Sequence, residues 1–123
     1  MSRDAVEQAR TVGLNIFRSI DLDESEEEVK ATAGVVCSIY ASNTNAAARW
    51  LKLYNATAAN VTVGTTVPVA TFYLPASGAN PVKLEAAALA FDTAITAAAT
   101  TGVADNDTGA PGANEVVVVI GYA

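Results

Sequence analysis

The chain has 123 residues, a formal net charge of −6 and no histidine. This length suffices for one domain with a hydrophobic core, and the absence of any basic segment argues against nucleic-acid binding through phosphate neutralisation. No segment approaches the ~18 consecutive apolar residues that a membrane span needs, so we expect no membrane partner.

Charged residues are concentrated near the amino terminus. Residues 1–30 contain eight acids and four bases, whereas the rest of the chain contains five acids and three bases. Because this second part falls far below the usual charged fraction of about a quarter, its surface must consist mainly of Thr, Asn, Ser, Ala and Gly. Such a surface suits contact with neighbouring subunits. The alternative is an ordinary monomer with a neutral polar surface.

The first 28 residues differ from everything after them. Their apolar residues recur at spacings typical of a short amphipathic helix, which Gly13 interrupts: Ala5, Ala9, Val12 and Ile16. Residues 21–28 (DLDESEEE) then supply six acids, either as a solvated acidic turn or as a segment that docks on a basic partner surface. We therefore expect an N-terminal arm over residues 1–28, extended or with a short helix, and a separate domain over residues 29–123.

From Val29 onward, alternation with a period of two predicts a series of strands. We expect strands over residues 35–42, 49–55, 67–74, 82–87 and 115–122, a short strand or connector at 61–66, and turns or loops at 43–45, 76–81 and 101–114. Leu51 and Leu53 form a buried aliphatic face opposite Trp50, Lys52 and Tyr54. The last of these strands (EVVVVIGY) is apolar on both faces, which is typical of a central or doubly covered strand.

Residues 84–100 are ambiguous. Their many alanines favour a helix, whereas alternating Thr and Ile in residues 91–96 (FDTAIT) favour a strand. We expect strands here; a helix would give an α+β fold instead. About seven short strands separated by turns predict an all-β fold, either an antiparallel β-sandwich or a jelly-roll-like barrel, with the N-terminal arm attached.

Side chains that carry enzymatic chemistry are scarce. Without histidine, neither Ser-His-Asp nor Cys-His catalysis is available, and a single cysteine cannot form a zinc site alone. That cysteine, Cys37, lies in an apolar alternating segment, so we expect a buried structural thiol and no intrachain disulfide. We expect no enzyme activity and no cofactor or metal.

Two patterns raise the question of ligand binding. Residues 105–109 (DNDTG) resemble the start of a calcium loop but lack its later glutamate, so an Asx turn is favoured. Four strand aromatics could stack on a sugar, although such residues more often pack across strands: Trp50, Tyr54, Phe72 and Tyr73.

Three segments resemble small virion-associated structural proteins of tailed bacteriophages: residues 26–34 (EEEVKATAG), 48–69 (ARWLKLYNATAANVTVGTTVPV) and 91–122 (FDTAITAAATTGVADNDTGAPGANEVVVVIGY). The resemblance covers roughly residues 20–122, and it is carried by RWLKLYNAT, VGTTVPV and the C-terminal loop and strand in combination. Some similar small β-sandwich proteins are capsid decoration, or cement, proteins. The resemblance therefore implies a role in the virion and leaves open in which part of it. We expect a location on the capsid surface, after assembly in the host cytoplasm.

We accordingly expect a capsid decoration protein that stabilises the head lattice through multivalent non-covalent contacts. Its expected partners are the major capsid protein and copies of itself, as a homotrimer. Ile16, Phe17 and Ile20 are the candidate anchors of the arm on a partner. Two other functions stay open: a tail, baseplate or fibre component, and a carbohydrate-binding module built around Trp50.

Overall fold

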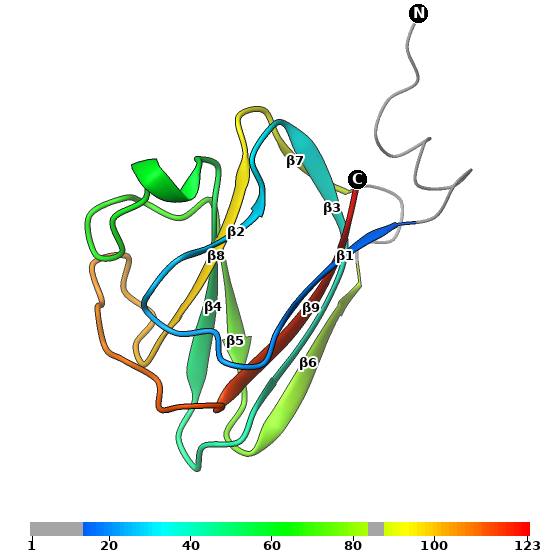
Figure 1. Ribbon diagram of the computed structural model, residues 1–123. Helices are drawn as coiled ribbons and strands as arrows, with labels where there is room; N and C mark the ends of the chain where they lie inside the picture. Colours follow the sequence, from blue (N-terminus) through cyan, green and yellow to red (C-terminus); the bar gives the residue numbers. More distant parts are fainter. Residues whose placement is uncertain (1–13, 84–87) are drawn as a thin grey trace, which may run out of the picture.

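Two antiparallel sheets pack face to face in this computed structural model, which describes residues 14–83 and 88–123 (Figure 1). The five-stranded sheet has the order β1-β9-β3-β6 with β7 also paired to β3, and the four-stranded sheet has the order β2-β8-β4-β5. The first contains β1 (Asn15–Ser19), β3 (Gly34–Asn43), β6 (Gly78–Lys83), β7 (Leu89–Phe91) and β9 (Val116–Tyr122). The second contains β2 (Glu27–Lys30), β4 (Arg49–Tyr54), β5 (Ala70–Leu74) and β8 (Ile95–Thr100), and a 3-10 turn, η1 (Ala58–Asn60), precedes β5. The expected all-β sandwich is confirmed.

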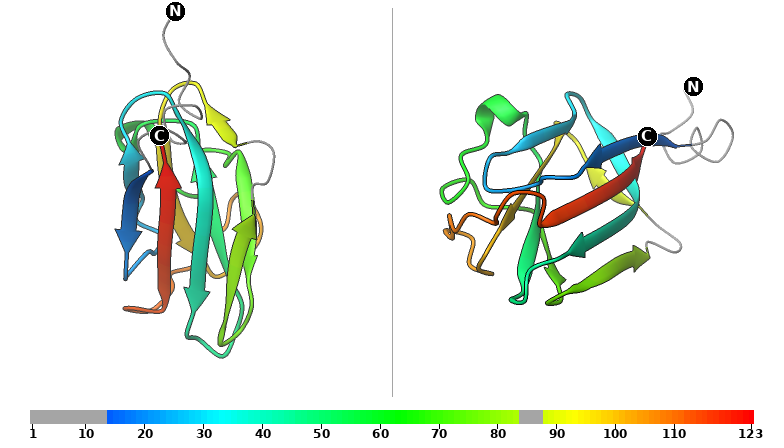
Figure 2. Two further views of the ribbon diagram at one scale, coloured as in Figure 1. Left: turned by 90° about the vertical axis from the view of Figure 1, so that its right-hand side faces the viewer. Right: turned by 60° about the horizontal axis from the view of Figure 1, so that its bottom comes forward.

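β9 lies in the middle of the five-stranded sheet, between β1 and β3 (Figure 2). Its β-branched side chains favour extended backbone and alternate between the two faces. Val116, Val118 and Ile120 are fully buried against the other sheet, whereas Val117 and Val119 are half-buried on the outer face. The expected central strand near the carboxyl terminus is confirmed.

The layer between the two sheets is aliphatic. Fully burying one Val, Leu, Ile or Phe side chain stabilises the fold by about 1.5–3 kcal/mol. The layer as a whole therefore contributes more to stability than the ionic contacts of the described residues. Its large buried side chains come from both sheets and from the β1–β2 connection: Leu22, Val36, Leu51, Leu53, Leu74, Phe91, Ile95, Val116, Val118 and Ile120.

The middle of the four-stranded sheet, β8 and residues 51–54 of β4, is buried on both faces. Every residue of β8 is buried. On the side away from the core, residues 55–69 and 101–110 pass over the sheet (Figure 1), where Tyr54, Val61 and Ala98 form a second small apolar cluster. Two β8 hydroxyls hold these segments on the sheet. Thr96 donates to the carbonyl oxygen of Ala56, in the first segment, at 2.6 Å, and Thr100 donates to that of Gly102, in the second, at 2.9 Å.

The alanine-rich segment forms strands where it is described. The expected strands are confirmed for β7 and β8, while residues 84–87 lie outside the described residues. Packing outweighs the helix propensity of alanine here, because a strand with small side chains can be covered closely on both faces.

Residues 15–28 differ from the expected arm. β1 pairs with β9 and β2 pairs with β8, so strands that precede residue 29 belong to both sheets. The physical reason is that one side of β9 and one side of β8 carry backbone N–H and C=O groups that need hydrogen-bond partners. β1 supplies them for β9, although apolar and polar residues alternate only weakly in β1. Residues 1–13, over which most of the amphipathic helix was expected, lie outside the described residues.

Three smaller expectations differ from the structure. The loop expected at 76–81 is shorter, because β6 begins at Gly78; Pro81 fits in β6 since this strand lies at a sheet edge. The strand expected from residue 67 begins at Ala70. Cys37 is half-buried rather than buried, because the β3–β9 register shifts between Val36 and Ser38 and disturbs the alternation there.

Shortening side chains on the two faces of β9 should have different effects on stability. Ile120→Ala removes a fully buried side chain and should lower the free energy of unfolding by about 2–5 kcal/mol. Val119→Ala, on the half-buried outer face, is the matched control and should cost about 1 kcal/mol. Urea unfolding followed by circular dichroism measures both, and equal losses would contradict this assignment of faces.

Candidate interaction surfaces

The outer face of the five-stranded sheet consists of alternate residues of its strands. Ile16 pairs with Gly121, and Arg18 pairs with Val119, which pairs in turn with Tyr40. These residues point away from the core because their neighbours along each strand point into it. Ile16 is 63% exposed and Tyr40 is 51% exposed, so this face is open to solvent in the described part of the chain.

The side chains that the structure describes on this outer face are nearly all uncharged. Arg18 is the one charged side chain described on it, and its remaining described side chains are small or apolar: Ser38, Ser42, Ala79 and Val117. At Gly121 an added Cβ would lie 2.6 Å from Leu14 Cδ1 and 2.5 Å from Ser38 Oγ, so any larger residue would displace the Leu14 or Ser38 side chain that lies over the sheet here. A neutral face of this kind loses little when another protein covers it.

The three candidate anchors from the sequence do not lie on one face of the sheet. Ile16 lies on the outer face, and Ile20, 48% exposed, follows the end of β1. Phe17 instead packs against the core, because it pairs with the inward-facing Ile120. The structure therefore leaves Ile16 and Ile20 accessible to a partner, whereas Phe17 helps to hold β1 on the sheet.

The acidic segment 21–28 is tied to the sandwich by hydrogen bonds. Asp21 accepts the backbone N–H of Asn114 at 2.8 Å, and Glu28 accepts that of Ala58 at 3.1 Å. Glu27 accepts the Ser19 hydroxyl at 2.8 Å. These carboxylates therefore fix loops of their own domain. Docking of this segment on a basic partner surface stays a prediction.

An aromatic pair lies on the outer side of the four-stranded sheet. Trp50 of β4 and Tyr73 of β5 are cross-strand neighbours with ring centroids 5.2 Å apart and ring planes tilted by 56°. Tyr73 is 49% exposed and Trp50 is half-buried. The other two aromatics considered for sugar stacking lie elsewhere, because Phe72 packs against the core and Tyr54 is buried under the covering segments.

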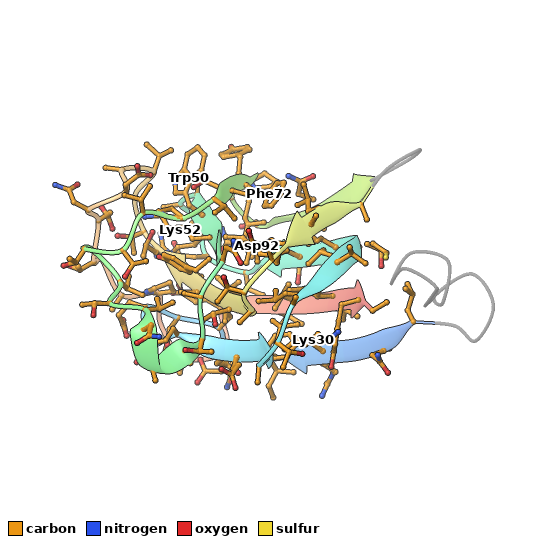
Figure 3. All side chains as sticks on the ribbon, turned by 90° about the horizontal axis from the view of Figure 1, so that it is seen from above. Lys30, Trp50, Lys52, Phe72 and Asp92 are labelled. Atoms are coloured by element: carbon orange, nitrogen blue, oxygen red, sulfur yellow. The ribbon has the colours of Figure 1, made fainter. Side chains whose placement is uncertain are left out.

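Lys52 is a fully buried cation on the outer side of the four-stranded sheet (Figure 3). Its Nζ donates to the Ala104 carbonyl oxygen at 2.6 Å, so it fastens the 101–110 segment to β4. Burial lowers the pKa of Lys52, and the nearby carboxylates of Asp107 and Asp105 oppose this effect. The sequence pattern placed Lys52 on the face opposite the leucines but gave no sign that a distant loop would bury it.

Beneath the same covering segments, the Tyr54 hydroxyl is buried without a hydrogen-bond partner in the described structure. Burial raises the pKa of Tyr54, and the negative charges of Asp105 and Glu26 raise it further. The neutral phenol is therefore the form that this environment favours.

The DNDTG segment forms an Asx turn, as expected. Asp107 Oδ1 accepts the backbone N–H of Gly109 at 2.8 Å, and Thr101 N–H donates to the Gly109 carbonyl oxygen at 3.2 Å. Within residues 14–83 and 88–123, no group of three or more acidic or cysteine side chains is arranged to hold a metal ion. The Asp107 side chain thus shapes the turn that carries Ala104 to Lys52.

One ion pair joins the two sheets at one end of the sandwich. Arg49 Nε, at the start of β4, lies 3.0 Å from Glu115 Oε2, just before β9. Asn45 donates to the other carboxylate oxygen at 2.7 Å. Burial acts to raise the pKa of Glu115, but hydrogen bonds from Gly112, Asn45 and Arg49 outweigh it, and the pKa is lowered.

No family model, curated protein or solved structure matches this chain. Among the residues that the structure describes, no helix has the length and apolar character to cross a membrane.

The buried Lys52 should give a characteristic pH dependence of stability. Its folded-state pKa lies below the usual 10.5, so between the two values the unfolded chain binds more protons and stability rises with pH. Lys52→Met removes this titration. We therefore expect wild type to gain stability relative to Lys52→Met as the pH rises from about 7 toward 10.5.

Urea unfolding of both proteins across this pH range measures the difference. The raised pKa of Tyr54 acts in both proteins and cancels in the comparison. Lys30→Met, at a half-buried lysine of β2, is the matched control. A difference between wild type and Lys52→Met that does not change with pH would show that Lys52 is solvated in the folded protein.

Proposed function

We propose that this chain is a structural subunit of a tailed-bacteriophage virion, and specifically a capsid decoration (cement) protein. The observation that carries the proposal is the outer face of the five-stranded sheet, which presents exposed Ile16 and Tyr40 with a single described charge, Arg18. An exposed neutral face across several strands is suited to contact with another protein. The resemblance of residues 20–122 to small phage virion proteins supports the same function.

The proposed mechanism is mechanical. Each subunit contributes a modest, mostly apolar contact to the major capsid protein and to copies of itself, and the symmetry of the head repeats that contact many times. Multivalency then stabilises the lattice without any single strong bond. The internal construction of the subunit fits this task, because the sandwich core and the buried four-stranded sheet supply a rigid support for the outer face.

A tail, baseplate or fibre component is the second candidate. The same neutral face would serve contacts in those assemblies equally well, and no residue of the chain distinguishes the two locations. The homotrimer was expected for the decoration protein and stays a prediction.

A carbohydrate-binding module is a candidate from a different class, and the Trp50–Tyr73 pair is the observation in its favour. Aromatic rings on a sheet surface can stack on a sugar. Against this, Trp50 is half-buried and two of the four aromatics considered are inside the protein. Binding of a glycan would change the fluorescence of Trp50, the single tryptophan, in a titration.

Immunogold electron microscopy of intact virions, with antibody raised against the purified protein, tests the proposed location. We expect label spread evenly over the heads, because a decoration protein occupies every equivalent lattice position. Label confined to the tail or its tip would favour the second candidate. Virions without label, prepared beside a labelled major capsid protein as control, would contradict a role in the virion.

A further inference from the structure

β1 is an outer strand of the five-stranded sheet, and its edge away from β9 is open among the described residues (Figure 2). The other outer strands are protected against pairing with a further strand. The register of β2 shifts between Glu28 and Lys30, β6 contains Pro81, and β7 has only three residues. In β5, the Tyr73 carbonyl oxygen accepts a hydrogen bond from Asn80 of β6 at 2.7 Å. Bulges, prolines, short strands and covering contacts keep sheet edges from joining other chains.

β1 carries none of these protections. It pairs with β9 over all of its residues without a register shift, and it contains no proline. Ile16 in this strand is 63% exposed, and the residues that directly flank the strand, Leu14 and Ile20, are 37% and 48% exposed. Arg18 is the one charged side chain of the strand. An edge strand with exposed apolar side chains and little charge is suited to accept an added strand.

The hydrogen bonds of β9 show which of its backbone groups point toward β1. Val116 of β9 accepts the N–H of Leu22, in the segment that follows β1, and Ala123 exchanges both backbone hydrogen bonds with Val35 of β3. Because the direction of these groups alternates along a strand, the even-numbered residues of β9 bond toward β1 and the odd-numbered residues bond toward β3.

The backbone groups at the open edge of β1 follow from this alternation. The even-numbered residues of β9 lie opposite Asn15, Phe17 and Ser19. The N–H and C=O groups of the two residues between them, Ile16 and Arg18, therefore point to the open edge. No backbone group of the described residues bonds to these four groups. An extended strand is the partner that satisfies all four at once.

The occupant that fits this edge is β1 of a second copy. In antiparallel pairing with Phe17 on the two-fold axis, all residues of β1 have a partner, and Ile16 of each copy exchanges backbone hydrogen bonds with Arg18 of the other. The stem of Arg18 then covers Ile16, and the half-buried Phe17 packs against its own copy. Leu14 of one copy comes next to Ile20 of the other, because antiparallel strands bring opposite ends together.

Other registers of the same pairing fit less well. With Arg18 on the axis, two arginines would lie directly opposite each other, which is unfavourable. With Ile16 on the axis, only residues 15–17 of β1 would pair. The sequence of β1 is therefore self-complementary in one register, as a two-fold contact requires.

We propose that two copies of this chain pair through β1, antiparallel and with Phe17 on the two-fold axis, so that their five-stranded sheets join into one. This inference deepens the proposed structural function, on which it rests, by naming a surface through which the subunit contacts itself. A two-fold contact joins two copies and so differs from the expected homotrimer. Because the interface is small, the pairing is weak and reversible in solution, and a lattice strengthens it by repetition.

Charge substitutions at Ile16 provide the first test. Sedimentation velocity at concentrations up to about 0.5 mM should show reversible dimers of wild type. Ile16→Lys places a lysine opposite Arg18 of the second copy and should dimerise roughly tenfold or more weakly. Ile16→Glu loses the same apolar side chain but places a carboxylate there, so it should dimerise roughly fivefold or more tightly than Ile16→Lys. Val67→Lys, at a valine that is 66% exposed and outside the strands, is the matched control and should dimerise as wild type.

Disulfide capture tests the register. With Cys37 replaced by serine, an equimolar mixture of Ile16→Cys and Arg18→Cys should form a cross-linked heterodimer on mild oxidation, because the two positions face each other across the axis. Each cysteine variant alone should cross-link roughly tenfold less, because its cysteines are offset along the strands. Circular dichroism verifies that every variant is folded.

Wild type that stays monomeric at about 0.5 mM would overturn the inference, and it is the result expected if a strand of a different protein occupies the edge. Equal cross-linking in the mixture and in the single variants would also overturn it. A monomer found on virions would leave the proposed function standing, whereas a dimer absent from virions would reject that function alone.

Discussion

The three consecutive alanines of β8 allow two layers to approach one strand from opposite sides. Ala97 and Ala99 face the core between the sheets, while Ala98 lies in the outer cluster with Tyr54 and Val61. Since a methyl group fills little space, the covering segments 55–69 and 101–110 pack directly on the sheet. The part of the four-stranded sheet formed by β8 and β4 is therefore a middle layer, and the burial of Lys52 and the fixed position of its loop both follow from this arrangement.

The five-stranded sheet has the opposite character, and this difference bears on function. Its inner face supplies Val118 and Ile120 to the core, but its outer face presents Ile16 and Tyr40 to solvent. In the acidic segment 21–28, Asp21 and Glu28 accept hydrogen bonds from the backbone of loops of the same domain. In its described residues this outer face is therefore a preformed surface with one charge, Arg18, and this property supports the proposed role of a subunit that acts by contact.

Period-two alternation and turn residues predicted the fold class and several strands from the sequence, with β3, β4 and β9 as the clearest examples. Tertiary pairing decided what local pattern could not. β1 has only weak alternation, yet it is a strand because β9 needs a partner at its edge. Burial of Lys52 and inward packing of Phe17 depend on contacts with residues 104 and 120, which are distant in sequence. The aromatic candidates do not form one surface, because Phe72 and Tyr73 are neighbours in β5 and their side chains point to opposite faces of the sheet. Phe72 packs against the core, and Tyr73 packs on Trp50.

Under the proposal that a tailed bacteriophage encodes this chain, quantitative mass spectrometry of purified virions of that phage tests the central claim most directly, because it measures how many copies each particle carries. A decoration protein occupies equivalent sites throughout the head lattice, so the account predicts a copy number comparable with that of the major capsid protein. The same preparation supplies that protein as an internal standard. Absence of the chain from particles that retain their other structural proteins would contradict the account.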